Sequence, residues 1–232
     1  MTLASENTRP PWYRQIATVI FSHWILKSIG ITFFISLFFV AYFYLLNNPA
    51  YPTTVMPIIT LDRLIGFQPL ALPLYLSIWV YISLPPVLLT RRHEFGNYAT
   101  GMTATCLSGL LMFYFWPTIV PAGAIDWTQS PQMDLLKHID AAGNACPSLH
   151  VATAVFSALW LHRQLRHFGT PMSILVLNWT WCGGILYSTL ATRQHVAVDV
   201  LAGLTLGALA GCLSLRRYKH SGMVRLATHR EP

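Results

Sequence analysis

Long runs of apolar residues, separated by short polar clusters, dominate the chain. Six runs contain no lysine, arginine or glutamate, and only the last of them holds an aspartate: 28–46, 72–90, 97–120, 148–161, 171–192 and 195–215. A membrane-spanning helix needs about 20 apolar residues, within a range of about 17–25, and five of the six runs are long enough. The pattern therefore predicts an all-α, polytopic membrane protein with six transmembrane helices in one bundle.

The fourth run, 148–161, is shorter than a full span. Its 14 residues cover about 21 Å as a helix, against about 30 Å for the hydrocarbon core of a bilayer. Pro147 suits the first turn of a helix, and Gly143 with Asn144 suits a turn just before it. We therefore expect this helix to begin near Ser148, with its first turn below the membrane surface.

The composition argues against an ordinary soluble enzyme. Hydrophobic residues make up 54% of the 232 positions and charged residues only 10%, whereas soluble domains carry about 25% charged residues. The net charge of +7 comes from short basic clusters between apolar runs, so we expect no nucleic-acid partner. The four cysteines form no C-x-x-C pair, and neither a zinc site nor a disulfide framework is predicted.

The distribution of the 15 lysines and arginines predicts the orientation of the chain. Twelve lie at the amino terminus or after the second, fourth and sixth runs, and only Arg63, Lys137 and Arg193 lie on the other side. Because basic residues favour the cytoplasmic side, both termini are predicted to be cytoplasmic. The loops 47–71, 121–147 and 193–194 would then face outward.

Three segments follow from this topology. Residues 1–26 form a cytoplasmic or interfacial N-terminal segment, in which 12–26 is predicted to be an interfacial helix. Residues 27–215 form the six-helix transmembrane domain, and 216–232 form a basic cytoplasmic tail. The first 26 residues lack the short apolar core and cleavage site of a signal peptide.

Two polar clusters open the fourth and sixth runs, and the predicted topology places both at the outer ends of their helices. The first reads Cys-Pro-Ser-Leu-His over 146–150 and the second Arg-Gln-His-Val-Ala-Val-Asp over 193–199. Polar groups inside a membrane span are costly and mark functional sites. We therefore expect the two clusters to lie together at similar depth.

Their residue types suit chemistry on a phosphate group. Asp199 lies four residues after His195, and a carboxylate beside an imidazole fixes its tautomer and raises its basicity, which suits a nucleophile. A helix that begins at Ser148 and Leu149 would bind an anion through the backbone N–H groups at its start. Arg193 would add a positive charge for the phosphate oxygens. His150, on the first turn, would protonate the leaving oxygen. Together these groups predict attack on a phosphoryl group through a phosphohistidine intermediate.

Other interpretations of the same residues remain open. Each histidine could be a packed, hydrogen-bonded residue, Asp199 could only balance Arg193, and Ser148 could be only a helix cap. His195 and Asp199 could also bind a metal if His138 or Asp140 in the preceding loop supplied another ligand. Cys146 is interpreted as a small apolar filler. We expect neither a metal nor a cofactor, since the proposed chemistry uses protein groups alone.

The two motifs resemble those of the type 2 phosphatidic acid phosphatase superfamily, which contains membrane lipid phosphatases and lipid phosphotransferases. The resemblance rests on Pro147-Ser148-x-His150 and His195-x-x-x-Asp199, in this order and separation, and covers about residues 60–215. It implies that His195 is the nucleophile and Asp199 its orienting partner. It also implies that His150 is the acid and Ser148 a phosphate ligand.

The chain departs from the family pattern at several positions. Ser188 stands seven residues before His195, as the family serine does, but Thr189 follows it in place of arginine. Leu149 replaces glycine in the first motif. The family's earlier lysine and Arg-Pro motif is missing, and Arg63 or Lys137 is expected to supply the cation. The Pro-Ser-Leu-His and Thr-x-Gln-His sequences are similar to those of inositol-phosphorylceramide-synthase-like members.

The leading hypothesis is a lipid phosphatase that hydrolyses a phosphomonoester or diphosphate of a lipid at the outward face. The first alternative is a phosphotransferase that passes a phosphoryl group or phospho-headgroup to an alcohol acceptor. A transporter with an aspartate–histidine proton relay is an alternative of another class, and a non-catalytic scaffold is a further one. The compact loops favour a bacterial inner membrane with the site facing the periplasm, although a eukaryotic lumenal site stays open; the oligomeric state is not predicted.

Overall fold

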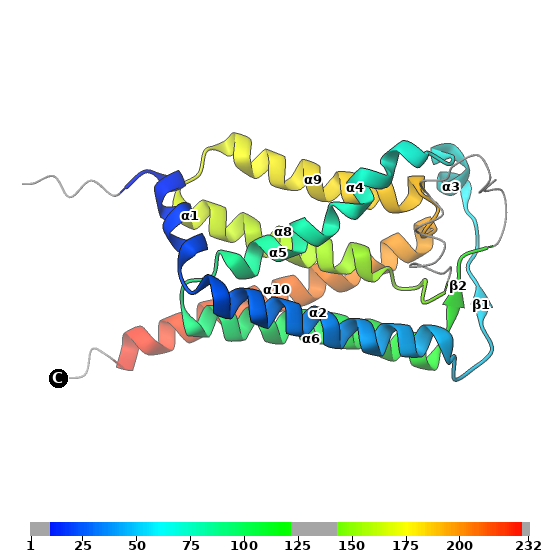
Figure 1. Cartoon of the computed structure of the whole chain (residues 1–232), viewed down its shortest axis with the longest axis horizontal. Coiled ribbons are helices and arrows are strands. Elements are labelled where there is room, and N and C mark those ends of the chain that lie inside the picture. Colours follow the sequence, from blue (N-terminus) through cyan, green and yellow to red (C-terminus); the bar gives the residue numbers. More distant parts are fainter. Residues whose placement is uncertain (1–9, 122–142, 229–232) are drawn as a thin grey trace, which may run out of the picture.

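The computed structural model describes residues 10–121 and 143–228, with side chains described as far as residue 217. Long helices run side by side along the molecule (Figure 1). These are α2 (Trp24–Asn47), α6 (Arg92–Phe115), α8 (Leu149–Phe168), α9 (Met172–Ala191) and α10 (Ala197–Thr228). A sixth rod is broken into η1 (Pro69–Ala71), α4 (Leu72–Leu76) and α5 (Ile78–Val87).

The helical, membrane-spanning character predicted from the sequence is confirmed in part. Within the described residues, four segments are long and apolar enough to cross a membrane: Trp24–Asn47, Pro69–Val87, Met172–Ala191 and Ala197–Arg217. Helices α6 and α8 have 24 and 20 residues and lie among these four (Figure 1). Both carry charged residues near one end, such as Glu94 and Arg163.

The predicted span 72–90 is not one straight helix, because the chain bends at Ser77 between α4 and α5. The Ser77 hydroxyl donates to the carbonyl of Leu74 at 2.6 Å and accepts from the Trp181 indole of α9 at 2.8 Å. At the other end of α5, the side chain of Gln164 on α8 donates to the carbonyl of Pro85 at 2.9 Å. Side chains of α9 and α8 thus add hydrogen bonds to the broken rod at the bend and beside the prolines.

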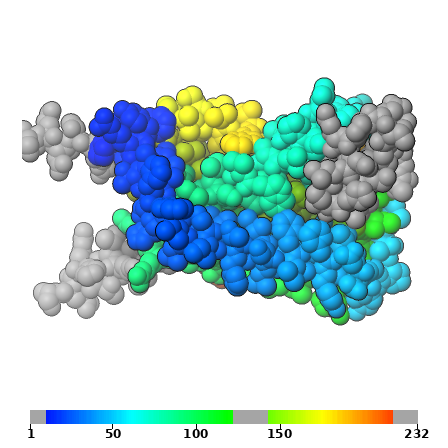
Figure 2. All heavy atoms as spheres, viewed as in Figure 1, coloured from blue at the N-terminus to red at the C-terminus, as the bar shows by residue number. Residues whose placement is uncertain are grey.

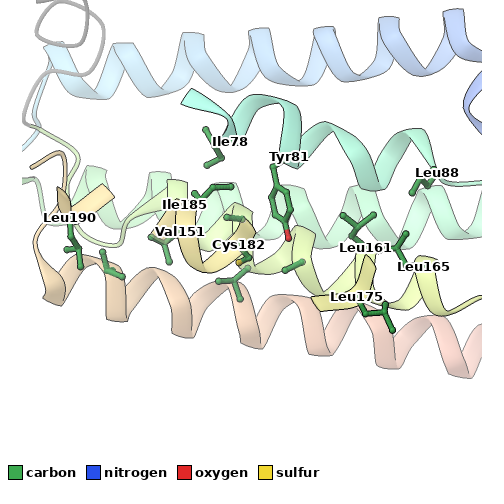
Figure 3. Packing of buried hydrophobic residues seen from close by; sticks show 14 of the residues in the cluster. Ile78, Tyr81, Leu88, Val151, Leu161, Leu165, Leu175, Cys182, Ile185 and Leu190 are labelled. Carbon is green, nitrogen blue, oxygen red and sulfur yellow. The ribbon is translucent and has the colours of Figure 1, made fainter. Parts of the chain in front are cut away.

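Helix α8 is the centre of the bundle. Most of its residues are buried, and its side chains pack against those of α5, α9 and α10 in one apolar cluster (Figure 3). A polar contact inside this cluster joins three helices: the Tyr81 hydroxyl donates to the Asn178 amide oxygen at 2.7 Å, and the Asn178 amide donates to the Ala158 carbonyl at 3.1 Å. Buried polar groups paired in this way fix which helix faces meet.

Helix α10 lies directly against α8 because two glycines allow their backbones to approach. A Cβ atom at Gly203 would collide with the carbonyl of Ser148, and one at Gly207 would collide with the carbonyl of Ala152. Small residues permit this type of close helix contact in membranes. The contact fixes the start of α10 beside the start of α8, where both polar clusters lie.

The helix boundaries agree closely with several expectations and differ at others. Helix α8 begins at Leu149 with Ser148 as its cap, as predicted, and continues to Phe168. A helix is present where the interfacial helix 12–26 was expected: α1 (Trp12–Phe21) ends before His23, which adopts a left-handed conformation with φ 54°. A short parallel pair, β1 (Thr54–Val55) with β2 (Thr118–Ile119), was not predicted.

Candidate active site

The two polar clusters meet at one end of the bundle, where α8 and α10 begin and α9 ends (Figure 1). The backbone N–H of Ser148 donates to the carbonyl of Asp199 at 3.1 Å. This bond links the first cluster directly to the second, across a gap of about 50 residues in the chain. The predicted convergence of the two motifs is therefore present in the structure.

The segment before α8 is held by β2. The backbone N–H groups of Ala145 and Cys146 donate to the carbonyl and hydroxyl of Thr118, at 3.2 and 2.7 Å. Ser148 then caps α8, since its hydroxyl accepts from the N–H of Val151 at 3.3 Å. These bonds fix the direction in which α8 leaves the loop, and with it the position of His150 on the first turn.

The run 195–215 predicted that His195 would lie on the sixth helix. In the structure His195 lies in the turn before α10. The carbonyl of Thr189 accepts from the N–H groups of both Gln194 and His195, at 3.1 and 3.2 Å. Helix α10 starts only at Ala197. One oxygen of the Asp199 carboxylate accepts from the N–H of Val196 at 3.1 Å, so Asp199 caps the helix on which it lies.

Asp199 and His195 face each other in a buried pair. The Oδ2 atom of Asp199 lies 3.7 Å from Nδ1 of His195, and the side chains are 0% and 7% exposed. Neither His195 Nδ1 nor Asp199 Oδ1 has a hydrogen-bond partner within the described residues. The distance exceeds that of a hydrogen bond, but catalytic contacts often tighten only when substrate binds. Because Nδ1 faces the carboxylate, Nε2 is the nitrogen of His195 left for a substrate.

The imidazole rings of His150 and His195 converge. Their centroids are 5.7 Å apart, with 59° between the ring planes. His150 comes from the first turn of α8, whereas His195 comes from the turn between α9 and α10. Two imidazoles at this separation can contact one small tetrahedral group from two sides.

Tyr75, on α4, is a site residue that the sequence analysis missed. Its hydroxyl and Nε2 of His150 share a hydrogen bond of 3.0 Å, and the two rings pack at 4.9 Å. Tyr75 is only 2% exposed. The bond fixes the orientation of the His150 ring. In the sequence, only the hydroxyl group of Tyr75 within an apolar run indicates this function.

Asp62, on α3 (Thr60–Ile65), is a second residue that the sequence analysis missed. It is 2% exposed. Its Oδ1 accepts from the N–H of Ala197 at 2.7 Å, and its Oδ2 accepts from the N–H of Ile59 at 2.9 Å. A carboxylate at the start of α10 also interacts favourably with the helix dipole. Asp62 thus positions the helix that carries Asp199.

We expect Asp62→Asn to destabilise the protein by about 1–3 kcal/mol, because an amide can accept at only one of the two positions and leaves a buried N–H without a partner. Thermal unfolding of the purified protein in detergent measures this. Arg63→Gln at the exposed neighbouring position is the matched control and should change stability by less than about 0.5 kcal/mol. Equal melting temperatures for the two variants would show that Asp62 does not hold α10.

Two of the predicted phosphate-binding residues, Leu149 and Ser188, are uncharged and buried. Leu149 places its side chain in an apolar cluster with Phe113 and Ala152, so only its backbone could face an anion. Ser188 is fully buried, and its hydroxyl donates to the Ile185 carbonyl of its own helix at 2.7 Å.

The three predicted cations also differ in position. Arg193 is half-buried between α9 and α10, at φ 59°, and its guanidinium makes no hydrogen bond or ion pair to any residue that the structure describes. Arg63 is exposed on α3. Lys137 lies outside the described residues. Of the three predicted cations, Arg193 is nearest to His195 in the sequence, two residues before it.

Cys146 is buried beside the site. Burial, and after it the nearby Asp199 carboxylate, raise the pKa of this thiol from 9.0 to about 11. At neutral pH the thiol therefore stays protonated, and it is a poor nucleophile. This agrees with its interpretation as a small apolar filler.

We accordingly expect iodoacetamide to leave Cys146 unmodified at pH 7.5 in the folded protein, with alkylation becoming faster only as the pH approaches 11. Mass spectrometry of peptides measures the modification, and denatured protein, in which all four cysteines react, is the control. Rapid alkylation of Cys146 at pH 7.5 would contradict the assigned environment.

No group of three or more histidines, cysteines or acids capable of holding a metal occurs within the described ranges 10–121 and 143–228. His138 and Asp140, the additional ligands considered from the sequence, lie outside those ranges. The described arrangement thus consists of two imidazoles, two buried carboxylates, one tyrosine hydroxyl and one arginine at the starts of α8 and α10.

A comparison with known proteins identifies the family of the chain. Neither curated proteins nor solved structures include a match to this chain. The model of the PAP2 superfamily, the superfamily of type 2 phosphatidic acid phosphatases, matches residues 96–222. The match covers more than half of the 232 residues and includes α8, α9, the start of α10 and both polar clusters. The chain therefore belongs to the PAP2 superfamily, whose members are phosphatases and phosphotransferases.

Proposed function

We propose that the protein is a membrane lipid phosphatase that hydrolyses a lipid phosphomonoester or diphosphate. The observation that carries the proposal is the pair of imidazoles, His150 and His195, with ring centroids 5.7 Å apart and a buried carboxylate behind His195. Membership of the PAP2 superfamily supports a phosphoryl-transfer reaction. The apolar helices support a substrate that reaches the site from a membrane.

In the first step, Nε2 of His195 attacks phosphorus. A P–N bond forms while the bond between phosphorus and the leaving oxygen breaks, and His150 donates a proton to that oxygen. The Asp199 carboxylate, 3.7 Å from Nδ1, stabilises the positive charge that develops on the His195 ring. In the second step, His150 removes a proton from water, water attacks phosphorus, and the P–N bond breaks to release phosphate. The enzyme returns to its starting protonation state.

Stabilising the negative oxygens of the phosphoryl group is the main catalytic task in this chemistry. The amino-terminal end of α8 offers the positive end of a helix dipole, where an anion binds favourably. Arg193, on the turn that carries His195, would neutralise a phosphate oxygen. In this proposal, Arg193 replaces the arginine that the family carries at the position of Thr189.

The proposal includes the six-span topology of residues 27–215, with 1–26 as an interfacial segment and 216–232 as a cytoplasmic tail. The supporting observation is the division of the 15 basic residues into twelve and three. Because basic residues favour the cytoplasm, the starts of α8 and α10 would face outward, into the periplasm of a bacterial inner membrane. Cysteine-accessibility labelling at Arg63→Cys and Arg166→Cys from each side of sealed vesicles tests this orientation.

The alternative is transfer of the phosphoryl group or phospho-headgroup to an alcohol, as in the inositol-phosphorylceramide-synthase-like branch. Leu149 in place of glycine and the Thr192-Arg193-Gln194-His195 sequence favour this alternative. The two reactions share the first step and differ only in whether water or an alcohol attacks the phosphoenzyme.

One experiment separates these two functions. Purified protein is given phosphatidate, phosphatidylglycerol phosphate or a polyprenyl diphosphate, with and without lipid and sugar alcohols, and free phosphate is measured. The double variant His150→Ala/His195→Ala sets the background. Phosphate release without an acceptor supports the phosphatase, whereas product formation that requires an acceptor supports transfer. Activity of the double variant equal to that of the wild type would refute both.

The hydrogen bond of Tyr75 predicts a specific kinetic effect. We expect Tyr75→Phe to lower kcat for an alkyl phosphate about tenfold, the cost of losing one hydrogen bond to an ionisable group. The ring packing against His150 would remain. With an aryl phosphate, whose leaving oxygen needs no proton, the rate of the first step should fall much less. Pre-steady-state rates of the first step with the two substrates measure this, and an equal loss for both would show that Tyr75 has only a structural function.

A further inference from the structure

An apolar groove runs from the candidate site along the inside of α2. It has a volume of about 430 Å³ and is lined by α2, α4, α5, α6 and the first turns of α8. None of its lining residues is a lysine, an arginine or an acid. Figure 2 shows α2 lying along the outside of the bundle, next to α5, so that α2 forms the outer wall of this groove.

The groove has its polar end at the candidate site. Tyr75, His150 and Thr153 line it there, and its opposite end is lined by Gly30, Pro86 and Phe95. Along α2 the lining extends from Gly30 to Tyr42, a helical rise of about 18 Å. One leaflet of a bilayer has a hydrocarbon depth of about 15 Å, half of a core of about 30 Å. The length of the groove therefore matches one extended hydrocarbon chain.

Hydrogen bonds near both ends of α2 attach this helix to neighbouring segments of the chain. Near its start, Lys27 donates to the carbonyls of Val19 and Val87, at 2.8 and 2.7 Å. Near its end, the Asn144 amide donates to the carbonyl of Tyr42 at 3.2 Å. Lys27 is the one buried residue of α2. Polar bonds at both ends thus position this wall beside the groove, together with aromatic contacts such as that of Phe39 with Trp79, whose ring centroids are 5.2 Å apart.

The apolar lining and the volume of the groove determine which kind of ligand it can hold. An apolar lining excludes a sugar or a charged headgroup, because either would lose its hydrogen bonds to water without replacement. Pockets that enclose one small molecule measure about 300–1,000 Å³, and a volume near the lower end of this range suits one chain better than two. Continuity with His150 indicates a chain that is attached to the reacting phosphate.

We infer that this groove holds one hydrocarbon chain of the substrate, with the phosphate at His150 and His195 and the chain end near Gly30. The inference rests on the proposed function and adds to it a preference for a limited chain length. A chain arriving from the bilayer already lies in hydrocarbon, so the groove contributes mainly by aligning phosphorus with His195. Misplacement of a reacting group by about 1 Å can cost about 100-fold in rate.

The test shortens the groove at its far end. A Cβ atom at Gly30 would find its nearest neighbour, Phe95, at 4.0 Å, so Gly30→Trp has room to enter the groove and fill its end. Gly183→Trp is the matched control, because nothing lies within 4 Å of a Cβ atom at this exposed position on α9. Gly30→Leu is a smaller second variant if the tryptophan prevents folding.

Monoalkyl phosphates with chains that reach about half or all of the 18 Å are compared as substrates. We expect Gly30→Trp to lower the ratio of kcat/KM for the long chain to that for the short chain at least about tenfold. Gly183→Trp should keep the wild-type ratio. An unchanged ratio in Gly30→Trp would overturn the inference while leaving the proposed function intact.

A second measurement does not depend on turnover. A long-chain alkyl phosphate with a photoreactive group on its last carbon should label the peptide around Gly30, and excess unlabelled alkyl phosphate should suppress this labelling. Labelling of the lipid-facing peptide around Gly183 should resist the competitor. If the wild type releases no phosphate but the Gly30 peptide shows this competition, the proposed function fails and the groove assignment stands. Labelling around Gly30 that no competitor suppresses would overturn the assignment.

Discussion

His195→Ala is expected to lower phosphate release from a lipid phosphate by at least about 10⁴-fold, the scale seen when a covalent nucleophile is removed from an enzyme. The reason is geometric: Nδ1 of His195 faces Asp199 at 3.7 Å, so only Nε2 can attack phosphorus. Cys146 cannot replace His195 as the nucleophile, because it stays a protonated thiol with a pKa of about 11. Initial rates with saturating substrate measure the effect.

The matched control is His162→Ala. His162 lies on the same helix as His150, 12 residues further along, which is about 18 Å toward the opposite end of the bundle. It accepts a hydrogen bond from the Trp179 indole at 3.2 Å and has no place in the proposed chemistry. Its variant should retain activity within about twofold of the wild type. Unchanged turnover in His195→Ala, with correctly folded protein, would rule out the nucleophile assignment.

His150→Ala is expected to lower kcat for an alkyl phosphate by about 10²–10⁴-fold, the usual contribution of a general acid or base. With an aryl phosphate the first step needs no proton donor. The variant should then release a rapid burst of aryl alcohol, close to one equivalent per active site, and stop. The second step would stay slow because His150 also activates the attacking water.

Stopped-flow absorbance of the aryl alcohol measures both phases. The alkyl substrate serves as the internal comparison, since it should give neither burst nor turnover in the same variant. If correctly folded His150→Ala gave no burst with the aryl substrate, the ring would contribute to the structure of the site and not to proton transfer. If the variant turned over the aryl substrate continuously at the wild-type rate, His150 would have no part in the second step.

Local sequence signals predicted where α8 begins. Pro147 and Ser148 are typical of a helix start, and the helix begins at Leu149 with Ser148 as its cap. The same counting of runs predicted that the two motifs would share one end of the bundle, which they do. The first feature depends on residues that are close in the sequence and the second on the number of spans between the motifs, so both can be inferred without the fold.

Contacts between distant segments could not be predicted in this way. Tyr75 reaches His150 across 75 positions, and Asp62 reaches Ala197 across 135 positions. Nothing in the residues around Tyr75 distinguishes it from other tyrosines in apolar runs. Which of them contacts the site depends on the bend at Ser77 and on how α4 packs against α9.

The placement of His195 before α10 also depends on contacts that the spacing alone does not reveal. The apolar run 195–215 predicted a helix that includes His195. Instead, the carbonyl of Thr189 accepts from the N–H of His195, and Asp62 and Asp199 cap the helix two residues later. The groove beside α2 is another such feature, since α2 is apolar on all sides and its sequence does not indicate which side faces the bundle.

The central claim is that the two converging imidazoles act on one phosphorus atom, with His195 as the covalent nucleophile. The most direct test is to mix His150→Ala with an aryl phosphate that carries radiolabelled phosphorus, quench the reaction in alkali, and locate the label by peptide mass spectrometry. We predict an acid-labile phosphoryl group on His195, absent from the His150→Ala/His195→Ala variant. A burst with no labelled protein, or a label on any other residue, would contradict the claim.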